Sequence, residues 1–514
     1  MSEPSLEFEP MREWGPEQVR RLVNVREAEN EDEQYRKLGI NRFFLPPEQE
    51  TAERGPGRLM AAIEVPDTDE EGTPQEPDYV EPTYFECVDF GWYINGRRGS
   101  DSWLDVYQKA PLSVLELTDA PRPMFSQKDE PGDIAWFSYA YEPSNDREAN
   151  ARLYTSLFAA GAPVRITGEP ERMSAPSSGP MCASGWVPVN AEAAVAYAAP
   201  ADFAELIDRL LPDLASTSGV AVYDVGQGAC QAIVDRRRHL PLLYVDFGGG
   251  VLYNRWTFPR DTAGFCFTQR PPVVLSHWDW DHWSSAALFP EALRAHWLTP
   301  PVPGTPIQQS LAAALYKSGR LHVWPDGGVG EIRRPGLRIE RCTGKTSNDN
   351  GLAVTAYSGA TGKRNCLLPG DASYRYIPSV LAGERFSALC MSHHGGKLHS
   401  MHYPTAKSRS VAVNSAGPRN SYKHPLLSTV AAHLDAGWPI PATTGFSNQR
   451  PCHVLLPWGS RPYLFRGGCH GTGCSVIPAQ TAPHAAEMVS VSLTPPPHKK
   501  STSKVAAMTG LVLP

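Results

Sequence analysis

Residues 273–282 read VVLSHWDWDH, a short apolar run that leads directly into two histidines and two aspartates. The run Val273-Val274-Leu275 is typical of a buried strand in a parallel sheet. Side chains just past such a strand lie where open α/β sheets place their sites. Without thiolates nearby, imidazole and carboxylate groups favour Zn²⁺ or Mn²⁺. The stretch therefore predicts a metal-binding loop after a core strand.

The order of the ligand-type residues in this loop predicts two cations. A tight loop can direct His277 and Asp279 to one side and Asp281 and His282 to the other. Two ions about 3.5–4 Å apart would then share the loop, as in two-metal hydrolases. The simpler alternative is a polar surface loop. We favour the metal site because ligand-type residues rarely occur at this density and because later segments supply further ligands.

Composition and charge restrict the class of protein. The chain has 514 residues, enough for two or three domains. Its net charge of −7 argues against a generic basic nucleic-acid binder, so such contacts would need a local patch and the metals. No apolar run reaches the roughly 18–20 residues of a membrane span, and the acidic N-terminus is unlike a signal peptide. The ten scattered cysteines suggest reduced thiols. We expect a cytoplasmic protein without membrane contacts.

The first 215 residues contain no recognisable chemical motif. A charged, Pro- and Gly-rich composition at 48–81 is typical of a linker. Strand-like segments follow, with helices expected at 147–160 and 191–214, which predicts an α+β accessory domain. A protein partner would bind through residues 1–215. The expected organisation is a partly disordered segment at 1–80, the accessory domain at 81–215, a metal-binding domain at 216–465 and a largely disordered extension at 466–514.

Several strands of the second half also end in a glycine turn or a polar residue. Asp224 and Asp246 stand at strand ends, where a carboxylate can orient metal ligands. An aspartate before glycine can equally be a turn former. Asp371 and the pair His393-His394 follow two further buried strands. The repetition of this pattern predicts that many strand ends meet at one site.

Six motifs in order resemble the metallo-β-lactamase fold, and more narrowly the hydrolase domain of ComEC-like competence proteins. They are DVGQG (224–228), VDFG (245–248), SHWDWDH (276–282), GD (370–371), HHG (393–395) and NSYKHP (420–425). The resemblance covers about residues 217–460. It implies an α/β fold, a four-layer αββα sandwich, with a dinuclear metal site. The membrane channel of the competence proteins has no counterpart here, so DNA uptake is not implied.

The resemblance also implies a ligand set. His277 and Asp279 would bind the first cation, Asp281 and His282 the second, and Asp371 would bridge them. Either His393 or His394 would complete the second site, and His394 is favoured by its place after the last strand. Broader members of the fold have histidine at the position of Asp279 and another near Asn348, where this chain has Asn348-Asp349-Asn350. The resemblance therefore implies a first cation that is loosely held or absent.

The expected activity is metal-assisted hydrolysis of a phosphodiester in DNA, RNA or a nucleotide. Asp281 would shuttle the proton of the attacking water. His424 and Lys423 would contact a phosphate or a developing oxyanion, with Asn420 beside them. The alternative for His424 is a buried histidine in a turn. Basic residues follow the metal-binding segments and could neutralise phosphates, or simply form a solvated face; they are Lys397, Arg409, Arg419 and Lys423.

Other interpretations remain open from the sequence. The domain could hydrolyse a small ester, lactam or lactone. It could also be a degenerate metal-binding module in a multiprotein system such as a defence system. Trp278 or Trp280 could stack a base in the groove or pack in the core. Near the C-terminus, Cys452, Cys469 and Cys474 are either free thiols or ligands of a structural zinc.

Overall fold

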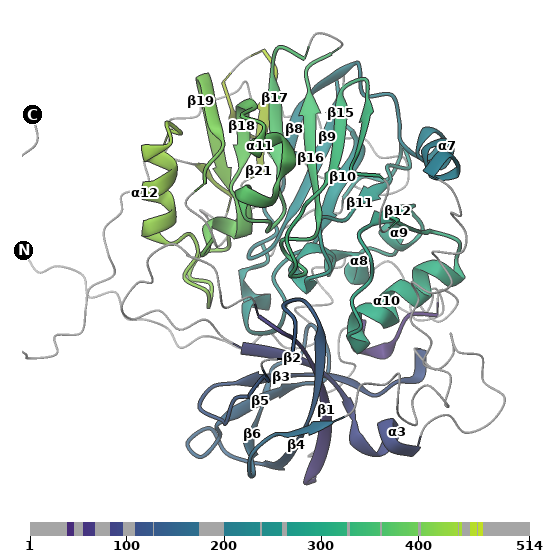
Figure 1. Ribbon diagram of the computed structural model, residues 1–514, viewed down its shortest axis with the longest axis vertical. Helices are drawn as coiled ribbons and strands as arrows, with labels where there is room; N and C mark the ends of the chain where they lie inside the picture. The colour runs from purple at the N-terminus through teal and green to yellow at the C-terminus, as the bar shows by residue number, and fades with distance from the viewer. Residues whose placement is uncertain are drawn as a thin grey trace, which may run out of the picture.

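The computed structural model contains three β-sheets with helices on their outer faces (Figure 1). It describes residues 39–45, 55–66, 83–95, 108–126, 128–173, 200–236, 239–259, 265–325, 329–359, 362–398, 402–439, 442–444, 453–459 and 461–465. The helical elements are η1 (Arg42–Phe44), α3 (Phe90–Asn95), α7 (Pro200–Leu210), η4 (Leu252–Thr257), η5 (Trp280–His282), α8 (Ser285–Leu288), α9 (Pro290–Leu293), α10 (Pro306–Lys317), η6 (Tyr374–Tyr376), α11 (Pro378–Leu381), η7 (Ser392–Gly395) and α12 (Leu427–Asp435).

The N-terminal sheet closes on itself. Its strands follow the order β1 (Gly57–Glu64), β2 (Thr83–Asp89), β3 (Leu112–Leu117), β5 (Ala151–Tyr154), β6 (Ala162–Ile166) and β4 (Ile134–Pro143). β1 then pairs with β4, and β7 (Glu171–Met173) adds to β4. Alternate residues such as Leu59, Phe85 and Leu115 fill the interior of this closed sheet. The opposite faces of the same strands pack against the rest of the molecule.

Two expectations for this part of the chain are wrong. The predicted helix at 147–160 is a turn followed by β5, and the class of the accessory domain is thus mainly β. The Asn145 side chain accepts hydrogen bonds from the backbone of Arg147 and Glu148, which favours a turn over a helix. β1 lies within the expected linker at 48–81. Of the helix expected at 191–214, the described residues form α7 at Pro200–Leu210, and proline is tolerated in the first turn of a helix.

The remaining two sheets pack face to face. One has the order β13 (Leu321–Val323), β12 (Trp297–Thr299), β11 (Val273–Val274), β10 (Pro241–Phe247), β9 (Cys230–Asp235), β8 (Thr217–Val222), β21 (His453–Pro457) and β22 (Tyr463–Phe465). The other has the order β14 (Glu331–Arg334), β15 (Leu337–Arg341), β16 (Leu352–Tyr357), β17 (Asn365–Leu368), β18 (Arg385–Cys390), β19 (Thr405–Asn414) and β20 (Ala442–Thr443). Alternate apolar side chains from both sheets form one shared core. Below we call this pair of sheets the sandwich.

Helices cover the outer faces of the sandwich (Figure 1). α8, α9 and α10 pack on the first sheet, and residues of α12 pack on the second. α7 packs against the shared core through Phe203 and Ile207, so it belongs to the sandwich and not to the closed sheet. The assignment of this arrangement to the αββα sandwich of the resemblance stays a prediction.

Among the described helices, none has the length and apolar character needed to cross a bilayer.

The closed sheet packs on the face of the sandwich that carries α10. Glu86 of β2 accepts hydrogen bonds from the backbone N–H groups of Ile307 (2.8 Å) and Gln308 (3.4 Å) at the start of α10. Its other oxygen accepts the indole N–H of Trp280 at 2.6 Å. Burial raises the pKa of Glu86 to about 7. One buried carboxylate thus joins the closed sheet to both a helix and the predicted metal loop.

Candidate metal centre

The loop after β11 begins between the two sheets. Its first residue, Ser276, accepts a backbone hydrogen bond from Leu352 at 2.7 Å, which ties the loop to β16. His277 and His282 are buried, while the side chain of Asp279 is 42% exposed. The loop is therefore closed toward the core and open toward solvent at Asp279.

Two overlapping groups of side chains meet here with ligand atoms within 4.8 Å of one another. They are His277 with His282 and Asp371, and Asp281 with His282 and His394. We call His277 and Asp279 the first cluster; their Nε2 and Oδ2 atoms are 3.3 Å apart. We call Asp281, His282 and His394 the second cluster; His394 Nε2 lies 3.1 Å from Asp281 Oδ2 and 3.2 Å from His282 Nε2.

Asp371 stands between the clusters with one oxygen toward each. Its Oδ1 lies 3.1 Å from His282 Nε2 and 3.7 Å from His394 Nε2. Its Oδ2 lies 3.8 Å from His277 Nε2 and 3.9 Å from His393 Nε2. Gly370 makes the approach possible, because a Cβ there would come within 2.4 Å of Ser276, and its φ is +60°. The arrangement suits a carboxylate that bridges two cations.

Buried partners set the proton positions on the imidazoles. His282 Nδ1 donates to Asp246 at 2.8 Å, and His394 Nδ1 donates to the backbone oxygen of Ser415 at 2.8 Å. Asp246 also accepts from the Ser276 N–H (2.7 Å) and hydroxyl (2.8 Å). In the neutral rings, Nε2 is then the unprotonated nitrogen that can bind a metal.

These tautomers indicate that a cation fits the site. Two lone pairs, on His282 Nε2 and His394 Nε2, face each other at 3.2 Å. His277 Nε2 is buried and has no hydrogen-bond partner among the described residues. Buried polar atoms are normally satisfied, and buried charges are paired or bind metals. Imidazole and carboxylate ligands in this arrangement are suited to divalent Zn²⁺ or Mn²⁺.

The electrostatics of the site also favour positive charge. Burial opposes protonation of His282, yet the carboxylates of Asp371 and Asp246 outweigh it and hold its pKa well above the usual value. Burial likewise opposes ionisation of Asp371, but His282, His394 and His393 hold its pKa well below the usual range. The Asp371 carboxylate thus stays ionised, and a bound cation could take the place of the proton on His282.

Adjacent histidines reach different sides of Asp371. His393 and His394 both have left-handed backbone conformations, with φ of 52° and 53°. His394 is buried in the second cluster, while the more exposed His393 faces the Oδ2 side of Asp371. His393 Nδ1 donates to the backbone oxygen of Lys397 at 3.0 Å, which again leaves Nε2 for a cation.

His424 lies beside the second cluster. Its ring stacks on those of Tyr422 and His394, with centroids 5.4 and 6.4 Å away. Burial, with His393 and His394 nearby, holds its pKa well below the usual value. The Gln227 amide donates to Nδ1 at 3.3 Å, so neutral His424 carries its proton on Nε2, which has no partner among the described residues. His424 is therefore a neutral hydrogen-bond donor.

Other predicted residues have structural roles in the described contacts. Asn420 bonds the backbone at both ends of the His424 loop, including the N–H of His424 at 2.9 Å. Lys423 is exposed in the same loop. Asp224 is buried in the glycine turn, where its carboxylate accepts from Gly226. Asn348 accepts a hydrogen bond from the Ser347 hydroxyl. Its neighbour Asp349 fixes the loop, because its carboxylate accepts the backbone N–H of Ser373.

The tryptophans of the metal loop pack inside the protein. Trp278 is 1% exposed and donates to the backbone oxygen of Pro300 at 3.1 Å, so the idea that it stacks a base is wrong. Trp280 contacts Glu86 and packs edge-on against Tyr84 of the closed sheet. Because Trp280 lies between the closed sheet and the sandwich, its position favours a role in anchoring one to the other.

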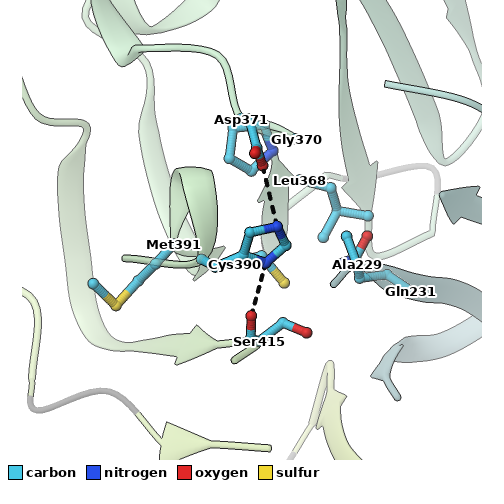
Figure 2. A pocket seen from close by; sticks show the side chains of 10 residues that line it. Ala229, Gln231, Leu368, Gly370, Asp371, Cys390, Met391 and Ser415 are labelled. Atoms are coloured by element: carbon cyan, nitrogen blue, oxygen red, sulfur yellow. Dashed lines mark hydrogen bonds and ion pairs between the residues drawn. The ribbon is translucent and has the colours of Figure 1, made fainter. Parts of the chain in front are cut away.

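A small cavity lies between the sheets below Asp371 and His394. Gly370, Ser415 and Gln231 contribute to its lining, together with apolar residues such as Leu368. Figure 2 shows this lining, with dashed lines that reach Asp371 and Ser415. Ser276 and Ser415 were not predicted as supporting residues, although both lie just past the ends of buried strands as the ligands do.

Comparisons with known proteins give only remote similarity. No protein-family model and no curated protein match the sequence. Among solved structures, the metallo-β-lactamase fold protein YhfI from Bacillus subtilis is 14% identical, with a TM-score of 0.22 over 34% of this chain and 70% of that one. MEM-A1, a subclass B3 metallo-β-lactamase from a soil metagenome library, is 16% identical, with a TM-score of 0.22 over 36% and 83%. CmlA, a diiron β-hydroxylase from Streptomyces venezuelae, is 12% identical, with a TM-score of 0.21 over 52% and 55%.

Proposed function

We propose that this protein is a metal-dependent hydrolase with a dinuclear centre, and that its substrate is a phosphodiester in DNA, RNA or a nucleotide. One observation carries the proposal: Asp371 presents one oxygen to the buried His277 Nε2 and the other to His282 Nε2, which is unprotonated in the neutral ring. Two bound divalent cations lower the pKa of water and stabilise charge on an attacked ester. At TM-scores near 0.2, the similar structures add nothing to this argument.

The protein's own residues would orient the reacting groups. Asp281 has a lowered pKa, because His394 and His282 outweigh the effect of burial, so it stays ionised at neutral pH. An ionised Asp281 could hold a cation and accept a hydrogen bond from the attacking water. Neutral His424 would donate its Nε2 proton in a hydrogen bond to the developing oxyanion.

Basic residues support a phosphate ester as substrate. Arg419 and Lys423 are exposed in the His424 loop, and Lys397 follows the His393-His394 turn. Such residues can neutralise phosphates beside a metal centre. Arg409, which we expected to join them, lies five residues before the end of β19 at Asn414, which is roughly 16 Å along the strand at about 3.3 Å per residue.

Activity against a panel of substrates tests the proposal. The purified full-length chain would be given labelled single- and double-stranded DNA, RNA, cyclic nucleotides and a chromogenic lactam and ester, with added Mn²⁺ or Zn²⁺. We expect cleavage of a phosphodiester that EDTA abolishes and that the double variant His277→Ala/Asp281→Ala lacks. His402→Ala, a change at an exposed histidine, is the control and should retain activity.

Three results would contradict this function. Full activity in the double variant would show that the clusters are not the catalytic centre. Turnover of only the lactam or ester would move the substrate to the small-molecule class. Fewer than one cation per chain by elemental analysis, with no activity, would favour a degenerate module.

A further inference from the structure

The ring of His424 is held more by packing than by hydrogen bonds. Among the described residues it has a single hydrogen bond, from Gln227 at the long distance of 3.3 Å, and its Nε2 atom has none. The space around the ring is narrow, because a Cβ on Gly396 would lie 2.5 Å from Nε2. The direction in which Nε2 donates therefore depends on the side chains that pack on the ring.

Tyr422 stacks on this ring. The two ring centroids are 5.4 Å apart and the ring planes are inclined by 24°. Stacked aromatic pairs have a preferred geometry and stabilise it beyond the burial of their surfaces. Tyr422 also stands two residues before His424 in the same loop, residues 420–425. A shift of the Tyr422 ring would therefore reach His424 both by contact and along the chain.

Tyr84, in β2 of the closed sheet, packs edge-on against Tyr422. Their ring centroids are 6.3 Å apart at an interplanar angle of 66°. Tyr84 also packs edge-on against Trp280 of the metal loop, at 6.1 Å and 81°. One side chain of the closed sheet thus contacts both loops that carry the proposed catalytic groups.

The closed sheet holds Tyr84 itself in place. Its hydroxyl donates to Glu116 at 3.4 Å, and the hydroxyl of Tyr154 donates to the other oxygen of that carboxylate at 2.5 Å. Glu116 lies directly opposite Tyr84 on the neighbouring strand β3. The rings of Tyr84 and Tyr154 pack edge-on, 6.5 Å apart. Tyr84 is therefore fixed by the strands of the sheet and not by a loop.

A second connection joins the closed sheet to the His424 loop. In η4, the backbone N–H of Leu252 donates at 2.8 Å to the oxygen of Leu157, three residues after β5. Asn254, in the same helical turn, bonds Ser421 twice, at 2.7 and 2.9 Å. Ser421 is the neighbour of Tyr422. The loop is therefore attached to the N-terminal part at two adjacent residues.

We propose that Tyr84 is a positioning residue that acts through Tyr422 and holds the His424 ring so that Nε2 faces the developing oxyanion. The inference rests on the proposed function, in which His424 is the hydrogen-bond donor. It gives the closed sheet a task in the reaction, since one of its side chains would set the geometry of a catalytic group in the sandwich.

A double-variant cycle in the full-length chain tests whether Tyr84 acts through His424. The substrate is the phosphodiester of the panel that the wild type cleaves fastest, with Mn²⁺ added. Tyr84→Leu removes the ring but keeps an apolar side chain. We expect it to lower kcat by about 10- to 100-fold, as displacement of a catalytic group does, and to leave KM little changed.

The second arm of the cycle removes the donor itself. His424→Ala should lower kcat by about 100- to 1,000-fold, as loss of one oxyanion donor does. Adding Tyr84→Leu to His424→Ala should lower kcat no further, because residues that act as a unit are not additive. A purely structural role of Tyr84 would instead lower kcat by the same factor in both backgrounds.

Matched variants make the result specific. Tyr139→Leu removes a ring from the interior of the closed sheet, where it packs against Phe85, and it should leave kcat at the wild-type value. Tyr84→Phe keeps the ring and loses only the bond to Glu116, so it should lower kcat less than Tyr84→Leu. Elemental analysis should give the wild-type metal content for each variant.

The outcomes separate this inference from the proposed function. With an active wild type, an unchanged kcat in Tyr84→Leu would overturn the inference alone, and so would an additive double variant or a loss of bound metal. If thermal unfolding shows that Tyr84→Leu does not fold, Tyr422→Leu takes its place in the cycle, and an additive result there would overturn the inference. A wild type that cleaves no phosphodiester would overturn both.

Discussion

The two clusters of the metal centre are built in different ways. The second cluster takes adjacent Asp281 and His282 from one turn, and His282 is oriented by Asp246, which bonds Ser276 twice. The first cluster has a buried His277 but an Asp279 whose side chain is 42% exposed. A site made within one loop and its supporting strands is preorganised. An exposed carboxylate is screened by water and salt.

This difference teaches that occupancy of the two clusters should be separable. The second cluster should bind its cation whenever the sandwich is folded. The first should respond more strongly to solvent and salt because Asp279 is exposed. The following variants sharpen or break this comparison.

Asp371→Ala should have the largest effect because this carboxylate serves both clusters. We expect both cations to be weakened and hydrolysis to fall by roughly three orders of magnitude or more, as expected for loss of a central catalytic group. Elemental analysis and steady-state rates measure this. Loss of only one cation at unchanged rate would show that Asp371 does not bridge the clusters.

Asp246→Asn should affect the second cluster alone. Asp246 accepts hydrogen bonds from the Ser276 N–H, the Ser276 hydroxyl and His282 Nδ1. The NH₂ group of asparagine is itself a donor, so it would face other donors there. We expect about 10- to 100-fold weaker binding of one cation and a loss of about 1–3 kcal/mol in the free energy of unfolding. Calorimetric titration and urea unfolding test this. Equal weakening of both cations would break the distinction between the clusters.

Asp279→Asn should have a smaller effect, confined to the first cluster. Its exposed carboxylate is screened by water, so we expect roughly tenfold weaker binding of one cation. The effect should decrease further in 0.5 M salt, whereas that of Asp246→Asn should not. An equal salt response of the two variants would argue against the difference in exposure as the cause.

Glu86→Gln should give the smallest change, in the pH dependence of stability. The pKa of Glu86 rises from 4.5 to about 7 in the folded protein, so the folded state holds a proton that the unfolded state releases. The proton held by Glu86 therefore adds to the free energy of unfolding. This contribution is fully present below about pH 4.5 and is lost as the pH rises through about 7. Between pH 5 and 8 the wild type should therefore lose on the order of 2 kcal/mol more than Glu86→Gln. Parallel pH profiles in urea unfolding would contradict this.

The metal loop could be predicted from the sequence because its ligands lie close together along the chain. A buried strand followed by HWDWDH places His277, Asp281 and His282 within one turn, and Asp371 and His394 follow neighbouring strands of the second sheet. Parallel strands bring such ends to one edge of the sheet. The structure brings these five residues together.

The parts of the fold and of the site that the sequence did not predict depend on contacts between distant residues. β1 pairs with β4 across more than seventy positions, and the alternation in β5 is too short to distinguish from helical periodicity. Asp224 accepts the N–H of Gly226, and a turn-forming aspartate has the same sequence pattern as a ligand-orienting one.

The place of β21 has a consequence for how the molecule is made. β21 lies next to β8, and His453 at its start accepts the backbone N–H of Asp224 at 2.8 Å. During synthesis, the edge of β8 therefore stays bare until residue 457 has emerged from the ribosome, while the strands that carry the ligands are already present. An exposed edge invites pairing with other chains, so nascent chains stalled before residue 453 should be prone to aggregate or to need a chaperone.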